Sequence, residues 1–81
     1  MLLTPKQLRA ARALLGWSRA TLADTSGVPA RTIENFAAEK STPLLTTAGK
    51  LRRTLERAGV IFVDPTKNQG PGVILKDGKL P

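Results

Sequence analysis

The chain has 81 residues and is therefore expected to form a single domain. It contains no cysteine and no histidine, which excludes disulfides, thiolate catalysis, zinc fingers and histidine general bases together. Its 13 lysines and arginines outnumber its 6 acidic residues, and the net charge of +7 favours a polyanionic partner, nucleic acid first and an anionic membrane second.

Nothing in the sequence predicts a secreted or membrane-spanning protein. Met1-Leu2-Leu3 is followed at once by Thr4 and Pro5, which leaves no apolar region typical of a signal peptide. No apolar run approaches the roughly 18 residues that a helix needs to span a bilayer. We therefore expect a cytoplasmic protein with no membrane partner.

The first predicted helix begins at a capping box. Thr4 is the expected N-cap, Pro5 suits the first helical position, and Gln7 completes the box. Gly16 is expected to end the helix, and Trp17 to fill part of the core. The apolar positions that share one face of this helix are Leu8, Ala11 and Leu15.

Two short helices are predicted next, separated by a glycine and a proline. Ser18 is the expected N-cap of the first, Gly27 ends it, and Val28-Pro29 forces an extended step before the next helix begins near Ala30. The side chains expected to point inward are Leu22, Ala23, Ser26, Ile33 and Phe36. Those expected to point outward from the second helix of the pair are Arg31, Thr32, Glu34 and Asn35.

This pair of helices is predicted to form a helix-turn-helix. Its two short helices are joined by a tight glycine turn and cross at a steep angle. The second helix then presents Arg31, Thr32 and Asn35 where a recognition helix faces the major groove. Arginine reads guanine and asparagine reads adenine, each through two hydrogen bonds. Glu34 is a candidate for cytosine, although a solvated role is the favoured interpretation.

A fourth helix is predicted after the breaker Ser41-Thr42-Pro43. Gly59 closes it, and Gly49 in its interior costs about 1 kcal/mol relative to alanine. The positions on its inner face are Leu45, Ala48, Leu51, Leu55 and Ala58. Its solvent side is expected to carry Arg52, Arg53 and Arg57.

The tail beyond residue 59 is predicted to form a two-stranded hairpin. Residues 60–63 and 73–76 are strand candidates, the segment between them is rich in turn formers, and Asp77-Gly78 is expected to form a final turn. Because a lone hairpin is marginal in water, its apolar side chains need a helical surface or a second subunit. We expect a homodimer contact through Val60, Ile61, Phe62, Val63, Val73, Ile74 and Leu75.

The segments "LRAARALLGWS", "LADTSGVPARTIENF" and "STPLLTTAGKLRRTLERAGV" resemble the XRE family of Cro/C1-type helix-turn-helix regulators over roughly residues 6–60. The resemblance implies a mainly α fold, with a four-helix, lambda-repressor-like DNA-binding domain over residues 1–59 and a C-terminal β segment for dimerisation over residues 60–81. It also implies a sequence-specific transcriptional regulator that binds double-stranded DNA as a homodimer on an inverted-repeat operator. We expect no cofactor and no metal.

The resemblance assigns roles to individual residues. The positions at which the family reads bases are occupied by Ala30, Arg31, Thr32 and Asn35. The positions at which it contacts DNA phosphates are occupied by Arg19, Lys40 and Thr42.

The chain also departs from the family pattern after the third helix. The family often has a glutamate there, followed two residues later by a glycine, but this chain has Ala37 and Glu39. The usual partner of that glutamate is an arginine at the position of Arg12. We therefore expect Arg12 either to reach another acid, Glu39 or Glu56, or to turn to solvent and the DNA backbone. The geometry of the loop after the third helix stays open.

Two other classes of function compete with this interpretation. A protein-interaction module, such as an antitoxin or an antiactivator, would use the same fold but would tend to expose apolar groups on the third helix. An enzyme is disfavoured because the sequence has no nucleophile–base pair, metal cluster or phosphate-cradling glycine loop. Gly70-Pro71-Gly72 is a turn and not a P-loop.

Overall fold

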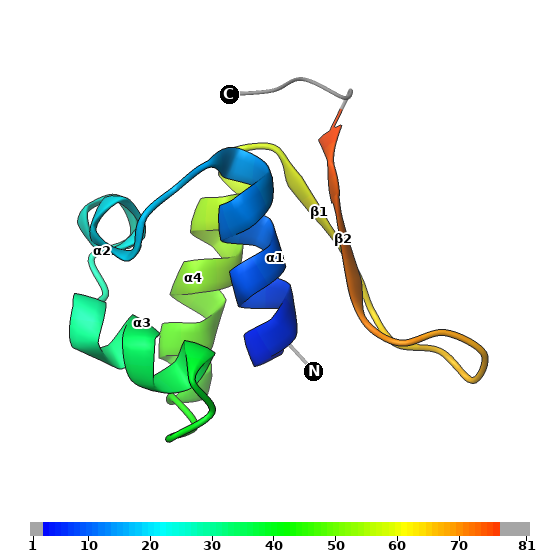
Figure 1. Cartoon of the computed structure of the whole chain (residues 1–81), viewed down its shortest axis with the longest axis horizontal. Helices are drawn as coiled ribbons and strands as arrows, with labels where there is room; N and C mark the ends of the chain where they lie inside the picture. The colour runs from blue at the N-terminus through cyan, green and yellow to red at the C-terminus, as the bar shows by residue number, and fades with distance from the viewer. Residues whose placement is uncertain (1–2, 77–81) are drawn as a thin grey trace.

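The computed structural model describes residues 3–76, which form four helices followed by a β-hairpin (Figure 1). The elements in chain order are α1 (Pro5–Leu15), α2 (Arg19–Ser26), α3 (Ala30–Ala37), α4 (Leu45–Arg57), β1 (Val60–Val63) and β2 (Gly72–Leu75). The predicted mainly α fold with a C-terminal hairpin is confirmed. The turn expected at Asp77-Gly78 lies outside the described residues.

The helices pack together and the hairpin lies along one side of them (Figure 1). α2 packs on α3 and α4, and α1 packs on α3. On the other side of the helices, β2 lies against α1 and β1 against α4. Within residues 3–76, none of the helices combines the length and the apolar character that crossing a bilayer requires.

Local sequence signals start and end the first two helices as predicted. Thr4 Oγ1 accepts a hydrogen bond from the Gln7 amide at 3.0 Å, and Gln7 Oε1 accepts one from the Thr4 amide at 2.9 Å, which completes the capping box. Gly16 and Gly27 end α1 and α2 with φ angles of 68° and 78°. Glycine adopts this left-handed conformation without steric cost, so both helices stop there.

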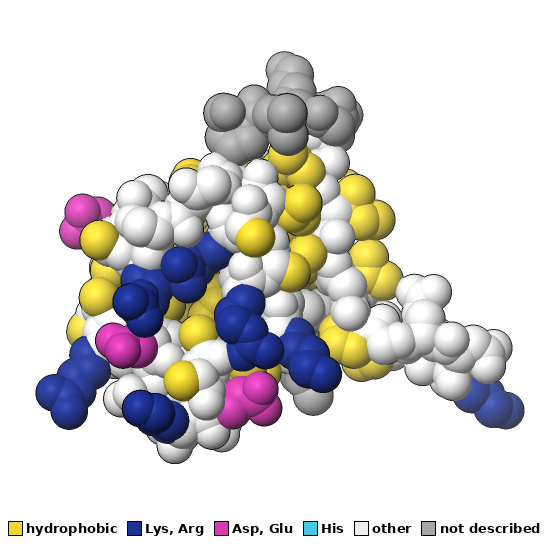
Figure 2. All heavy atoms as spheres, in the orientation of Figure 1, with side chains coloured by type: hydrophobic (Ala, Val, Ile, Leu, Met, Phe, Trp, Pro, Cys, Tyr) yellow, Lys and Arg dark blue, Asp and Glu magenta, His cyan; other side chains and the backbone are white. Residues whose placement is uncertain are grey.

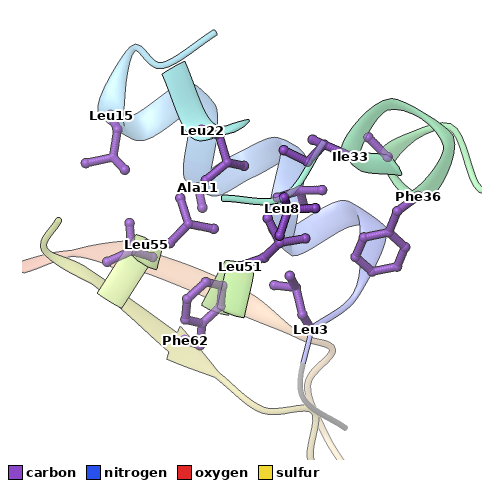
Figure 3. Packing of buried hydrophobic residues seen from close by; sticks show 13 residues of the cluster. Leu3, Leu8, Ala11, Leu15, Leu22, Ile33, Phe36, Leu51, Leu55 and Phe62 are labelled. Carbon is purple, nitrogen blue, oxygen red and sulfur yellow. The ribbon is translucent and has the colours of Figure 1, made fainter. Parts of the chain in front are cut away.

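The core is built from side chains that every helix contributes (Figure 3). The largest fully buried side chains are Leu8, Leu22, Ile33, Leu51 and Leu55. Leu3, which precedes α1, and Phe62 of β1 are also buried in this cluster. Trp17 packs against the cluster but is only partly buried. The predicted core is therefore largely confirmed, with Leu3 as an addition.

Two residues of α4 lie elsewhere than predicted. Leu45 was expected on the inner face but is 76% exposed, because it is the first residue of the helix and burial begins one turn further along. Arg52 was expected on the solvent side, but the exposed fraction of its side chain is only 19%. Its guanidinium lies 5.0 Å from the centroid of the Phe62 ring and pairs with Glu56 at 3.3 Å and Asp64 at 3.4 Å. The hairpin packs over this side of α4, so Arg52 contacts the hairpin and is not fully exposed to solvent.

The inner face of the hairpin belongs to the core of the same chain. The strands pair antiparallel, with Val60 opposite Leu75 and Phe62 opposite Val73. Val60 and Phe62 are 2% and 8% exposed, and Val73 and Leu75 are partly buried against the helices. Val60 and Phe62, which the sequence suggested as dimer contacts, are therefore buried within one protomer because the helices already supply the surface that they need.

The outer face of the hairpin is apolar and uncovered. Ile61 and Ile74 lie opposite each other in the strand register and are 45% and 53% exposed. Val63 shares this face, since side chains alternate along a strand. Figure 2 shows apolar side chains gathered along the hairpin. This face is the part of the predicted dimer contact that stays available to a partner.

The side-chain amide of Gln7 joins the start of α1 to the hairpin. The residue is 3% exposed, and its Nε2 atom donates to the carbonyl oxygens of Val63 at 3.1 Å and Gly72 at 3.2 Å. Val63 and Gly72 are opposite each other in the register, so one amide holds both strands. The sequence predicted the capping role of Gln7 but not this second role.

Replacing Gln7 with alanine is expected to destabilise the protein by about 2–3 kcal/mol, because it leaves two partly buried carbonyl groups without this donor and removes half of the capping box. Urea denaturation of the full chain measures this loss. Lys6→Ala is the matched control on the exposed side of the same turn and should change the free energy of unfolding by no more than about 0.5 kcal/mol. Equal losses in the two variants would contradict the structural role of Gln7.

Candidate nucleic-acid interface

α2 and α3 are joined by a short turn that the sequence predicts in detail. The amide of Gly27 donates to the carbonyl of Ala23 at 2.9 Å, which closes α2. Val28 is buried, and its amide donates to Ser26 Oγ at 3.1 Å. Pro29 occupies the N-cap position of α3 and makes no side-chain capping bond. The turn therefore redirects the chain within three residues, as a helix-turn-helix requires.

α3 has one buried face and one open face. Ile33 and Phe36 are 0% and 5% exposed and point into the core (Figure 3). Arg31 is exposed and Asn35 is half-buried, four residues further along the same helix. Within residues 3–76, neither of these two side chains forms a hydrogen bond or an ion pair with the protein. Their donors and acceptors are therefore free to meet base edges.

The other predicted base-reading residues lie at the same end of α3. Ala30 is exposed at the first helical position, and Thr32 is half-buried beside the helix-turn-helix joint. The structure thus brings Ala30, Arg31, Thr32 and Asn35 together on two turns of one helix, as the sequence suggested.

Arg19 links the two helices of the motif. Its Nη1 atom lies 3.6 Å from Oε1 of Glu34 on α3, and both side chains are about half exposed. An exposed ion pair of this kind adds little stability, so Arg19 is free to exchange its partner for a phosphate. Glu34 pairs with Arg19 in this arrangement and is otherwise exposed to solvent.

Arg12 lies beside the start of α2. Its Nε atom donates to the carbonyl oxygen of Trp17 at 3.2 Å. Partial burial, and secondly the positive charge of Arg19, lower the pKa of Arg12 from its usual value. The guanidinium stays protonated at neutral pH nevertheless. Two arginines thus converge near the N-terminus of α2.

Of the two alternatives expected for Arg12, the pairing with Glu39 or Glu56 is not found in the described chain. Glu39 pairs instead with Arg9, whose Nη2 atom lies 3.7 Å from its carboxylate and whose Nη1 atom donates to the carbonyl oxygen of Ala37. Glu56 is bound by Arg52. Arg9 lies one turn before Arg12 on α1 and is nearer to the end of α3. Which arginine of α1 pairs with Glu39 depends on how close each one lies to the end of α3. The spacing of residues in the sequence does not give that distance.

The loop between α3 and α4 depends on an unusual conformation of Glu39. This residue has a φ angle of 61°, in the left-handed region that favours glycine. Its amide donates to the carbonyl of Phe36 at 3.0 Å, and the amide of Lys40 donates to the carbonyl of Asn35 at 2.8 Å. The chain therefore makes without glycine the turn for which the family often uses glycine. Lys40 and Thr42, the predicted phosphate contacts, are both exposed in this loop.

The distribution of charge distinguishes the helices from the hairpin. Figure 2 shows Lys and Arg side chains gathered over the helical part of the visible face, with fewer acidic groups among them. Apolar side chains dominate along the strands in the same view. A basic surface beside a helix with unpartnered polar side chains is the pattern of a nucleic-acid interface.

The fold and this site define a helix-turn-helix DNA-binding protein. A family model described as Helix-turn-helix matches residues 8–58, from the first turn of α1 to the end of α4. The match covers more than half of the chain, which therefore belongs to the XRE family of Cro/C1-type helix-turn-helix regulators. A search among curated proteins found no match to the chain.

Replacing Glu39 with glycine is expected to stabilise the protein by about 1 kcal/mol, because the left-handed conformation costs a residue with a Cβ atom about 1–2 kcal/mol and glycine very little. Urea denaturation measures the difference. Glu39→Ala removes the same weak ion pair but keeps the backbone strain, so it should not be more stable than the wild type. A gain that is equal in both variants would show that strain at Glu39 is not the cause.

Proposed function

We propose that this regulator recognises a specific DNA sequence and binds it as a homodimer on an inverted-repeat operator. One observation carries the proposal. α3 buries Ile33 and Phe36 and leaves the side chains of Arg31 and Asn35 without a hydrogen bond or ion pair to the described chain. Binding, and not catalysis, is the proposed activity. The proposed location is the cytoplasm, because the protein would meet its operator DNA there.

Sequence is read by the first two turns of α3. Arg31 donates two hydrogen bonds to O6 and N7 of a guanine, and Asn35 pairs with N6 and N7 of an adenine one turn further along. Thr32 and Ala30 are small enough to allow close approach, and the methyl group of Ala30 packs on a thymine methyl group. The four positions together address neighbouring base pairs of one half-site.

Contacts to phosphates hold α3 in register. Arg19 at the start of α2 and Lys40 and Thr42 after α3 flank the reading helix on its two sides. Charged and hydroxyl side chains at these points neutralise or bind phosphate oxygens without reading sequence. Arg12, whose acid partner is missing within residues 3–76, adds a further positive charge beside Arg19.

The outer face of the hairpin is the proposed dimer contact. A domain of this size buries only about 60–65% of its unfolded surface, so an additional apolar contact is a natural source of stability. Ile61 and Ile74 form an exposed cross-strand pair, and a second copy would cover the same pair through a two-fold axis. The symmetric dimer would then place two copies of α3 on one duplex and require a palindromic operator.

The base-reading roles predict altered sequence preferences. Arg31→Ala should relax the preference at one base pair in each half-site and weaken binding to the best site by about 1–3 kcal/mol, and Asn35→Ala should do so at a neighbouring pair. Selection of binding sites from random DNA measures both. Lys67→Ala is the control, because it removes the same charge from an exposed position in the hairpin loop, outside both basic surfaces. If both α3 variants select the wild-type sites with helical content retained, α3 is not the reading helix.

The dimer contact predicts that a charge on the outer face of the hairpin separates the protomers. Ile61→Glu should weaken dimerisation about 100-fold or more, because the two-fold axis places the change in the contact twice and each buried isoleucine contributes about 1.5–3 kcal/mol. Sedimentation equilibrium measures the dissociation constant. Leu45→Glu is the control, since Leu45 is 76% exposed at the start of α4. If only Leu45→Glu dissociated the dimer, the interface would lie on α4 and not on the hairpin.

A further inference from the structure

A second basic site lies away from α3, between the end of α2 and one side of α4. It is a pocket of about 200 Å³ lined by Thr25 and Ser26 of α2 and by Lys50, Arg53, Thr54 and Arg57 of α4. Neither α3 nor the loop that follows it contributes a lining residue. The pocket is therefore separate from the proposed DNA-reading surface.

The positive charges of this pocket have no counter-charge in the described chain. Lys50, Arg53 and Arg57 are spaced three and four residues apart and so share one side of α4. Within residues 3–76, no carboxylate lies within 4 Å of any of them, and none donates a hydrogen bond to the protein. Glu56, their acidic neighbour in the sequence, is bound by Arg52. Three like charges at this spacing repel one another unless an anion joins them.

Gly49 leaves space on α4 for one of these cations. A Cβ atom at Gly49 would lie 3.2 Å from Nη1 of Arg53, so the guanidinium occupies the space that a larger residue would need. A glycine inside a helix is otherwise unfavourable. The missing side chain lets Arg53 lie back along α4 beside the pocket. The glycine accommodates this conformation of Arg53 without fixing it, because the guanidinium is the free end of a flexible side chain.

The hydroxyl groups of the pocket add one free donor. Thr25 and Thr54 donate their hydroxyl protons to carbonyl oxygens one turn earlier in their own helices, at 2.8 Å each. Ser26 Oγ instead accepts a hydrogen bond from the amide of Val28, so its proton is free to donate. The polar side chains of the lining that have no acceptor in the described chain are therefore all hydrogen-bond donors, namely the three cations and the hydroxyl group of Ser26. This set fits an oxyanion.

We propose that this pocket binds a small diphosphate group, either free or as part of a nucleotide. The three cations span about 10 Å along α4, which is too long for one phosphate and suits two in series. The pocket is open to solvent, and its volume of about 200 Å³ admits a diphosphate group, while the rest of a nucleotide would extend beyond its mouth. The bound anion bridges the end of α2 to α4 and so strengthens the support of the helix-turn-helix. This inference does not depend on the proposed DNA-binding function.

Thermal unfolding of the full chain with inorganic pyrophosphate tests the site. At about ten times its dissociation constant, pyrophosphate should raise the Tm by about 5–10 °C over sodium chloride at the same ionic strength. The rise should disappear in the double variant Arg53→Gln/Arg57→Gln and persist in the double variant Arg19→Gln/Arg31→Gln, which removes the same charge from α2 and α3. An equal rise in both variants, or with sodium chloride, would show a nonspecific salt effect and overturn the proposal.

Chemical-shift mapping of the wild type gives a test that needs no variant. Pyrophosphate should shift the amide signals of Thr25, Ser26 and the second half of α4, and shifts confined to α3 would overturn the proposal. ADP distinguishes the two sources of the diphosphate: tighter binding than pyrophosphate, with shifts in the same residues, indicates a nucleotide, and equal binding indicates the diphosphate alone.

The DNA backbone is the competing occupant of this surface. If the pocket is a small-anion site, the Arg53→Gln/Arg57→Gln variant should bind duplex DNA within about threefold of the wild type and show the same dependence on salt. A loss of tenfold or more, together with no pyrophosphate effect, would assign these cations to DNA contact and reject the proposal.

Discussion

The position of α3, the proposed reading helix, depends on the burial of Leu22 and Ile33 against α1 and α4. α2 and α3 have eight residues each, which is too short for helices to be stable alone in water. Both side chains are completely buried and point toward Leu8 and Leu51 (Figure 3). Because a helix that buries one side must present the other, this packing also turns Arg31 outward. The stability of both helices and the exposure of Arg31 therefore rest on the same few contacts.

Some of the charged side chains form ion pairs within the protein, and others are left without an acidic partner in the described chain. Four carboxylates, those of Glu34, Glu39, Glu56 and Asp64, pair with arginines that connect neighbouring elements or turns. Since most of the few acids are used in this way, many of the lysines and arginines of residues 3–76 have no carboxylate partner, and several of these gather on two surfaces. One surrounds the open side of α3, and the other lines the pocket between α2 and α4. The net charge of +7 is thus concentrated on two basic surfaces, the first proposed to contact DNA and the second proposed to hold a small anion.

The hairpin shows how one segment serves two surfaces. Its inner side chains complete the core, and the Gln7 amide and the Arg52 guanidinium hold its backbone and its edge to the helices. Its outer side is left with Ile61 and Ile74. Alternation along the strands makes this division unavoidable, because a strand that buries one face must present the other. The same alternation reduces the seven apolar residues of the predicted dimer contact to the few that face outward.

The sequence by itself determined the features that depend on neighbours along the chain. Caps at Thr4 and Ser18, left-handed glycines at 16 and 27, and apolar spacing predicted the helices, the helix-turn-helix and the residues on the open side of α3. Only the tertiary structure decided which partners distant groups meet. Arg52 turned to the hairpin, Gln7 gained the strand carbonyls, and Glu39 took a left-handed turn and paired with Arg9. Local signals act through bonds within one turn, whereas these contacts depend on how whole elements pack, which no spacing along the chain encodes.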